Sequence, residues 1–497
     1  MAAGLRGLAA GGAAGIDRAV NEDHIRLAVT GLSRAGKTVF ITSLIHNLLA
    51  LGQRRNTLPS LTARLTQDGI SRLRSVEVLP AGASVLPVFD YGAKLADLAA
   101  DAPSWPPRTG DLAQVSLALE VDRVSSLGRR LGPRRIRLDI LDYPGEWLLD
   151  LPMMDQDFAA WSAQTLALLR TPPRRGCSEA FLAYLDDMRA DDRPEDTRVR
   201  RGHELYKEAL ETCRTQHGLR YLQPGRFVCP GPQSDAPFMW FFPMDVPAGP
   251  PRPGSVAALL GQRFDAYQAR MRADFFDTHF AAFDRQVMLV DVLGAMYAGQ
   301  AAFEDTARVI GDLAGALQYG GNVFSRTIAA GVVRSYGTLL PTVLGRATGA
   351  AVQRMASRRI ERVAFVATKA DHVPAMKRDN LVHLLRALAS SSAVQDGMAA
   401  AAASYSAAAS ILSTRDGTGR VGDRTVEVVE GVVLGEERSR PFFVGEVPSR
   451  VPPASFWSEQ LFELPVFRPP ALDPTGLGGI PHLNLDQVLD DVIGDLL

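Results

Sequence analysis

Residues 31 to 38 carry the spacing G-x-x-x-x-G-K-T, a pattern whose residue types can surround a phosphate. Gly31 and Gly36 can adopt backbone angles that turn successive N–H groups inward. Lys37 supplies a mobile cation for the outer phosphates, and the Thr38 hydroxyl can ligate Mg²⁺. The Arg34 guanidinium either crosses the phosphates and assists hydrolysis or simply faces solvent. The predicted phosphate-binding residues of this loop are Gly31, Ser33, Arg34, Ala35, Gly36, Lys37 and Thr38.

A second pattern, D-x-x-G, runs from Asp142 to Gly145. A carboxylate at the end of a strand can hold Mg²⁺, and the glycine lets a main-chain N–H approach a terminal phosphate. We therefore expect Asp142 beside the metal and Gly145 beside that phosphate. Glu146 follows, and its carboxylate can orient or deprotonate a water although its charge opposes the phosphate. Thr109 is a further candidate Mg²⁺ ligand, or else an ordinary loop threonine.

The third pattern is T-K-x-D at Thr368, Lys369 and Asp371, directly after the apolar run 362–367. The carboxylate of Asp371 can accept hydrogen bonds from guanine N1–H and from the exocyclic amine together. Adenine offers no such pair of donors, so this carboxylate would discriminate between the two bases. The stem of the lysine can cover the face of the base. We interpret the three residues as a base-binding set.

Strand-like runs precede all three patterns, at residues 25–31, 135–141 and 362–367. The run 135–141 alternates apolar and polar residues, and 114–121 is expected to be its antiparallel partner. The run 286–293 is apolar throughout, like a buried strand. After the first loop, apolar residues recur at helical spacing, so a strand, a phosphate-binding loop and a helix follow one another.

The middle of the chain reads as helical rather than as part of a sheet. Residues 158–169, 178–190, 197–213 and 255–283 have helical patterns, which indicates an inserted subdomain. The predicted divisions are a flexible lead-in at 1–24, the first part of an α/β core at 25–146, the helical subdomain at 147–285, the second part of the core at 286–414 with a helical insertion at about 298–360, and a C-terminal extension at 415–497. We also expect helices at 61–74 and 322–359, a last core strand at 404–412, and a β-ribbon at 425–433 and 442–447.

Composition narrows the class of partner. The chain has 497 residues and a formal net charge of -1, which gives no electrostatic case for nucleic acid. Its three cysteines lack metal-site spacing and fit a reducing compartment. The first residues are too weakly apolar for a signal peptide, and no long uncharged apolar window predicts a transmembrane helix. The arginine-bearing run 322–359 either packs on the sheet or lies on a membrane surface or a partner.

The order of the three patterns resembles that of the Ras-like GTPases of the P-loop (Walker A) class. More narrowly, the chain resembles the YcjX-like family of bacterial stress-associated GTPases. The segments that carry this resemblance are 31–38, Trp105 to Thr109, Asp142 to Leu148, Thr368 to Asp371, Phe442 to Pro448 and Phe467 to Pro470. The resemblance implies an α/β fold, with a mostly parallel sheet covered by helices on both faces and the nucleotide at the carboxyl ends of the strands. It also implies GTP or GDP as ligand, Mg²⁺ as cofactor, a cytoplasmic protein and a membrane-protein partner from the same stress regulon.

Two departures from the Ras-like pattern bear on activity. Glu146 stands where many such enzymes carry a glutamine, and Thr368 replaces the usual asparagine of N-K-x-D. We therefore expect a slow GTPase that works as a nucleotide-dependent switch. A nucleotide-gated scaffold with little hydrolysis is the alternative, and an ATPase with a coincidental T-K-x-D is a third hypothesis. The last base-contacting loop stays unplaced, near Ser406 or between Ser410 and Thr414.

Overall fold

The computed structural model describes residues 22–32, 34–82, 86–106, 111–124, 132–231, 235–313, 360–390, 402–421, 423–459, 464–472 and 478–497. Two predicted site residues, Ser33 and Thr109, fall outside these ranges. The predicted helix at 322–359 and most of the lead-in at 1–24 also fall outside them.

A seven-stranded sheet forms the centre of the protein, in the order β4-β5-β6-β1-β7-β8-β9. Five neighbouring strands, from β6 to β9 in that order, run parallel, while β5 and β4 are antiparallel. The mostly parallel sheet expected from the resemblance is thereby confirmed. The strands are β1 (Glu22–Gly31), β4 (Leu73–Val78), β5 (Ala113–Val121), β6 (Arg134–Asp142), β7 (Arg285–Val290), β8 (Arg362–Ala367) and β9 (Ala402–Ala407).

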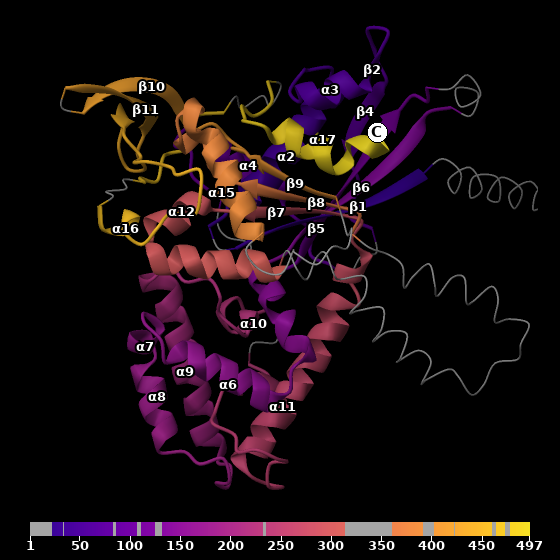
Figure 1. Cartoon of the computed structure of the whole chain (residues 1–497). Helices are drawn as coiled ribbons and strands as arrows, with labels where there is room; N and C mark the ends of the chain where they lie inside the picture. The colour runs from indigo at the N-terminus through magenta and orange to yellow at the C-terminus, as the bar shows by residue number, and fades with distance from the viewer. Residues whose placement is uncertain are drawn as a thin grey trace, which may run out of the picture.

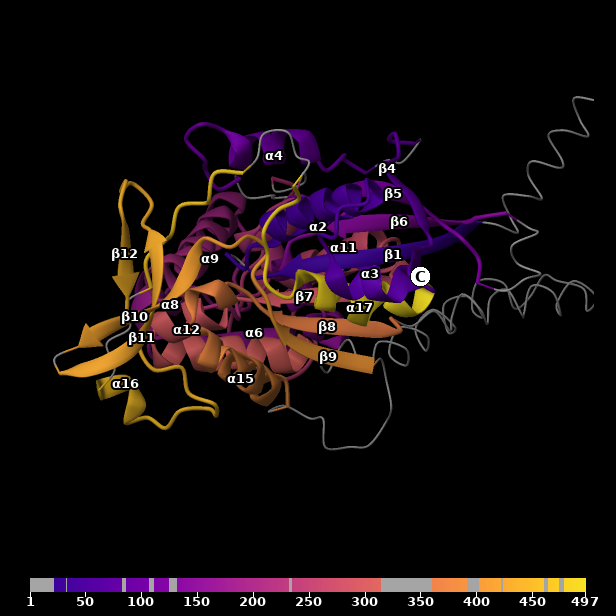
Figure 2. The same cartoon turned by 90° about the horizontal axis from the view of Figure 1, so that it is seen from above.

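Helices cover both faces of the sheet because successive strand residues point to opposite sides. In β8, Ala364 and Val366 join one apolar cluster, whereas Val363 and Phe365 join another. The first face carries α2 (Lys37–Gly52), α3 (Pro59–Leu65) and α17 (Leu485–Ile493), which lie over the strands in Figure 2. The opposite face carries α15 (Arg378–Ser390), α12 (Val292–Tyr297), the helical residues 300–313 and a large helical lobe. This arrangement confirms the expected two-sided α/β fold.

The helical lobe comprises the elements between β6 and β7 and hangs below the sheet in Figure 1. Its centre is aromatic: the Trp161 ring lies 5.1 Å from that of Phe264 and 5.5 Å from that of Phe241. One apolar cluster runs from this centre to the face of the sheet. The elements are the 3-10 turns η1 (Gly145–Asp150) and η2 (Pro152–Asp155), helices α6 (Phe158–Leu169), α7 (Arg174–Cys177), α8 (Glu179–Asp186), α9 (Asp196–Gln216) and α10 (Gly225–Val228), the turn η3 (Pro237–Met239), helix α11 (Val256–Met271), the π-turn η4 (Arg272–Phe276) and η5 (Phe280–Ala282).

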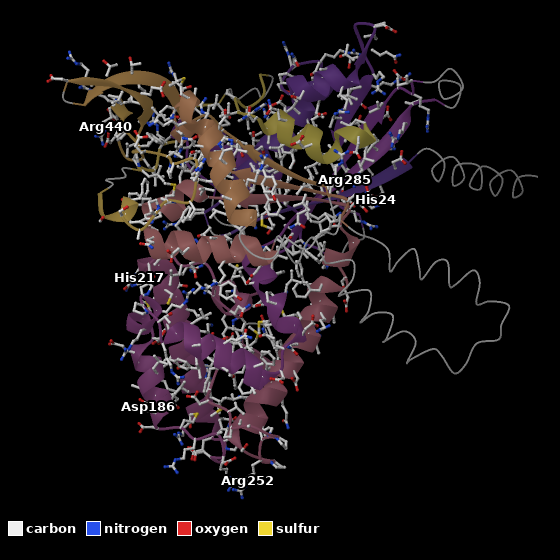
Figure 3. The ribbon with its side chains drawn as sticks, in the orientation of Figure 1. His24, Asp186, His217, Arg252, Arg285 and Arg440 are labelled. Atoms are coloured by element: carbon white, nitrogen blue, oxygen red, sulfur yellow. The ribbon has the colours of Figure 1, made fainter. Side chains whose placement is uncertain are left out.

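The predicted C-terminal ribbon is a three-stranded antiparallel sheet, separate from the central one. Its strands are β10 (Thr414–Val421), β11 (Arg424–Val432) and β12 (Ser439–Phe442). Arg440 marks it in Figure 3, whereas His24 and Arg285 mark the amino ends of β1 and β7. The second ribbon strand was predicted at 442–447 and instead ends at Phe442. Helix α16 (Phe456–Glu459) follows, and α17 ends the chain with η8 (Gly494–Leu496).

The predicted helix at 61–74 is wrong beyond its first turns. Helix α3 ends at Leu65, and the chain reverses through β2 (Thr66–Gln67) and β3 (Ile70–Ser71) before entering β4. Asp68 and Gly69 between these short strands have φ of 52° and 77°. An aspartate–glycine pair favours this left-handed turn, which a helix cannot accommodate. The next helix, α4 (Tyr91–Ala99), is capped by the Asp90 side chain. Among the described residues, no helix combines the length and the apolar character needed to span a membrane.

Candidate nucleotide site

The phosphate-binding loop joins β1 to α2 in a closely packed turn. Gly36 precedes α2 with φ of 79°, and Arg34 is exposed with φ of 70°. A Cβ on Gly31 would lie 2.9 Å from the carbonyl oxygen of Leu289 and 3.0 Å from the Ala35 methyl, so only glycine fits there. The amino end of α2, which begins at Lys37, therefore directly follows this loop, and backbone N–H groups at a helix amino end favour an anion such as phosphate.

Lys37 and Asp142 meet at the floor of the site. The ammonium Nζ donates to the Tyr143 carbonyl at 2.7 Å and lies 2.8 Å from Asp142 Oδ1. The Asp142 side chain is 1% exposed, and among the described residues neither of its oxygens accepts a well-directed hydrogen bond. A buried carboxylate with unused lone pairs beside a cation is a hard oxygen ligand of the kind Mg²⁺ prefers. These residues, together with Thr38 at the start of α2, therefore fit the predicted metal.

Gly145 touches the loop from the D-x-x-G side. A Cβ on Gly145 would come within 2.6 Å of the Gly31 carbonyl oxygen, so the two patterns are in backbone contact. Glu146 follows as the second residue of η1. The phosphate-binding loop, Asp142 and Gly145 are thus brought together at the carboxyl ends of β1 and β6.

The predicted base-binding set, Thr368, Lys369 and Asp371, lies at the carboxyl end of β8. Thr368 N–H donates to the Val290 carbonyl at 2.9 Å, which ties the set to β7. Lys369 has φ of 60°, and its Nζ lies 2.5 Å from Asp291 Oδ2. Burial alone would raise the pKa of Asp291, but the charge of Lys369 and the hydrogen bonds from Lys369 and the Gly294 N–H together outweigh it, and the pKa falls below its ordinary value. The sequence did not predict a role for Asp291, because the pattern shows only an acidic residue directly after an apolar strand.

Ser413 lies between Ser410 and Thr414, one of the two places that the sequence left open for the last base-contacting loop, and it contacts Asp371. Ser413 donates to Asp371 Oδ2 from its N–H at 2.9 Å and from its Oγ at 2.8 Å. Among the described residues no donor reaches Asp371 Oδ1 within hydrogen-bonding distance. One carboxylate oxygen of Asp371 is therefore fixed by the protein while the other keeps its acceptor capacity.

Comparisons with known proteins identify the family of the chain. The family model described as "YcjX-like family, DUF463" matches residues 25–497. The chain is 34% identical to the Ras-like GTPase YcjX of Escherichia coli (strain K12) over 494 residues, covering 97% of each protein. It is 31% identical over 497 residues to the Ras-like GTPase YcjX of Shewanella oneidensis, covering 95% of each. The chain belongs to the YcjX-like family.

In this YcjX-like chain, the turn after Gly145 is attached to the helical lobe. The Trp147 indole N–H donates to the Cys229 carbonyl at 3.1 Å, and the Arg226 guanidinium lies 3.7 Å from the centre of the indole ring. Asp150 accepts hydrogen bonds from the Gly225 N–H at 2.7 Å and from the Tyr267 hydroxyl at 2.5 Å.

Gly225 also packs directly on the Glu146 backbone, because a Cβ at this position would overlap the Glu146 carbonyl. Burial raises the pKa of Asp150 to about 6 against the effect of its two hydrogen bonds. The turn η1 is thus joined to α10 and the adjoining Cys229 through Glu146, Trp147 and Asp150.

Proposed function

We propose that this protein binds GTP and GDP with Mg²⁺ and hydrolyses GTP slowly. One observation carries the proposal: Lys37, Asp142, Gly145 and Asp371, which are predicted from separate patterns, converge on the carboxyl edge of one sheet. The names of the two relatives, both Ras-like GTPases, support it.

The proposed reaction is transfer of the γ-phosphoryl group of GTP to water. Lys37 and the N–H groups at the start of α2 would stabilise charge on the transferred group, and the Gly145 N–H would contact it. Thr38 and Asp142 would hold Mg²⁺, which supplies further charge neutralisation when bound. The Glu146 carboxylate would bring a negative charge near an anionic phosphate, and we attribute slow hydrolysis to that repulsion.

Switching would begin at Gly145, because this residue touches the phosphate-binding loop and is the first residue of η1. A shift of Gly145 towards the γ-phosphate would pull on Trp147 and Asp150, and through them on α10. The helical lobe would then report the nucleotide state to a partner. The stress role, the membrane-protein partner and the cytoplasmic location implied by resemblance stay predictions.

A nucleotide-gated scaffold remains the second candidate, and the observation that favours it is again Glu146 at the catalytic position. Single-turnover hydrolysis separates the two. A slow switch converts bound GTP to GDP within minutes to an hour, whereas a scaffold retains intact GTP for many hours.

The binding proposal is tested by titrating GDP, GTP, ADP and ATP, with Mg²⁺, into the wild type and Asp371→Ala. We expect guanine selectivity in the wild type and its loss in the variant, because the carboxylate that pairs with both donors is gone. Asp379→Ala is the matched control, since Asp379 is exposed on α15. Equal binding of all four nucleotides by the wild type would contradict the GTPase proposal.

A further inference from the structure

The loop that carries Asp371 is fastened to the C-terminal sheet. Thr414, the first residue of β10, donates its hydroxyl to the Asp371 carbonyl at 2.5 Å. Two residues later, Asp416 accepts the Ala375 N–H at 3.0 Å and the Arg378 guanidinium at 2.8 and 3.0 Å. The base-binding loop is therefore tied to β10 at three points.

A chain of hydrogen bonds reaches the Asp371 carboxylate from inside the protein. Ser413 Oγ lies 2.8 Å from Asp371 Oδ2 and 3.2 Å from His372 Nε2. The serine has one proton, and the carboxylate can only accept, so that proton lies towards Asp371. His372 must then donate from Nε2. Burial lowers the pKa of His372, which keeps the ring neutral and makes this single N–H its donor.

Phe467 holds the His372 ring from the other side. The two rings lie edge to face at 4.8 Å and 78°. Phe467 is 1% exposed and packs on Gly431 of β11, where a Cβ would come within 2.6 Å of the phenyl ring. Its neighbour Arg468 donates its N–H to the Val432 carbonyl at 2.8 Å. The phenyl ring is thus held by the backbone of the C-terminal sheet.

Trp105 extends the same contact towards the first half of the chain. Its indole N–H donates to the Phe467 carbonyl at 2.8 Å. Its ring packs against the apolar cluster that includes Ile411, two residues before Ser413. A series of contacts therefore leads from Trp105 through Phe467, His372 and Ser413 to the Asp371 carboxylate.

We infer that Phe467 and His372 are positioning residues for base recognition, which set the orientation of the Asp371 carboxylate through Ser413. The C-terminal sheet is then part of the guanine-specificity machinery of the protein. This inference rests on the proposed function, and it adds a role for a region outside the three nucleotide patterns. A carboxylate that must face two donors loses its advantage when it rotates, even if its charge is unchanged.

The test compares GDP with IDP, which lacks the exocyclic amine that Asp371 would accept from. Affinities for both are measured for wild type, Phe467→Leu, His372→Phe and His372→Gln. Phe467→Leu and His372→Phe are expected to reduce the GDP-over-IDP preference about tenfold. His372→Gln keeps an N–H donor and is expected to restore most of that preference. Phe456→Leu serves as the control, because Phe456 is a C-terminal phenylalanine whose ring lies edge to face against Trp457.

The outcomes separate the two proposals. A wild type without guanine preference contradicts the proposed function itself. If the wild type is selective but Phe467→Leu and His372→Phe bind both nucleotides more weakly at an unchanged ratio of GDP to IDP affinity, only the positioning role is overturned. Unfolding temperatures of all variants show whether Phe467→Leu is folded. If it is not, the comparison of His372→Phe with His372→Gln still tests the positioning role.

Discussion

At the scale of single residues, the Lys37–Asp142 ion pair is the feature that bears most directly on metal and phosphate binding. Both side chains are largely buried, with 10% and 1% exposure, so each charge needs the other or a ligand. Phosphate and Mg²⁺ would separate the pair by offering each a new partner of opposite charge. In the proposed site, the pair would therefore favour a metal–nucleotide complex over either component alone.

Asp142→Asn tests this account. The amide keeps the size of the side chain but loses the charge that would attract Mg²⁺. We expect the affinity gain that Mg²⁺ gives the wild type for GTP, measured against EDTA, to shrink at least about tenfold. Asp122→Asn, on an exposed carboxylate paired with Arg74, is the control. An unchanged Mg²⁺ effect would remove Asp142 from the metal site.

The raised pKa of Asp150 predicts that the stability of the protein depends on pH. Its pKa is raised to about 6 in the folded protein by burial, so the folded state retains a proton that the unfolded chain loses near pH 4. The stabilising contribution is therefore present below pH 4 and is lost as the pH rises through 6. Asp150→Asn has no such loss, so its stability relative to wild type should rise by roughly 2–3 kcal/mol between pH 4 and 7. Urea unfolding at both pH values measures it, and parallel changes in the two proteins would contradict it.

At the scale of elements, sequence patterns predicted best where chemistry and local structure coincide. The strand, loop and helix around Gly36 follow from glycine spacing and apolar periodicity within about two dozen residues. Ser413 was different, because its role depends on a contact with Asp371 across 42 positions in the sequence. The short strand β4 was also missed, since its edge position leaves only Leu73 and Val76 buried and the pattern resembles a helix.

The contact between η1 and α10 is close enough for a single methyl group to disturb it. Gly225→Ala places a methyl group against the Glu146 carbonyl and must push the two segments apart. We expect nucleotide binding to persist while the lobe stops responding to the γ-phosphate. Hydrogen exchange at residues 225–228 measures this, with a GTP analogue compared with GDP.

Gly176→Ala is the matched control for this variant. Gly176 lies in α7 of the same lobe, and a Cβ there would meet nothing within 4 Å. If Gly225→Ala keeps the nucleotide-dependent difference in exchange at α10, the contact between η1 and α10 is not the route by which the lobe senses the site.

At the scale of the whole molecule, the end of the chain completes the core that positions the loop. Helix α17 buries Leu485, Val488 and Leu489 in the cluster shared with α2 and β1. Nearby, Asn47 of α2 exchanges hydrogen bonds with Ile480 through its side-chain amide, at 3.0 and 3.1 Å. The phosphate-binding helix is thus supported by residues more than 400 positions later, and stability and binding should be separable there.

Leu489→Ala tests that separation. Leu489 is fully buried, and truncating a buried leucine typically costs about 2–5 kcal/mol through lost transfer free energy and the remaining cavity. We expect a lower unfolding temperature but a GDP affinity close to wild type at low temperature, because no site residue is touched. Saturating GDP should then recover part of the loss, since a ligand that binds only the folded state stabilises it. Gln487→Ala, on the exposed side of α17, should change neither quantity. A large loss of GDP affinity in a folded Leu489→Ala protein would mean that α17 shapes the loop itself rather than supporting its helix.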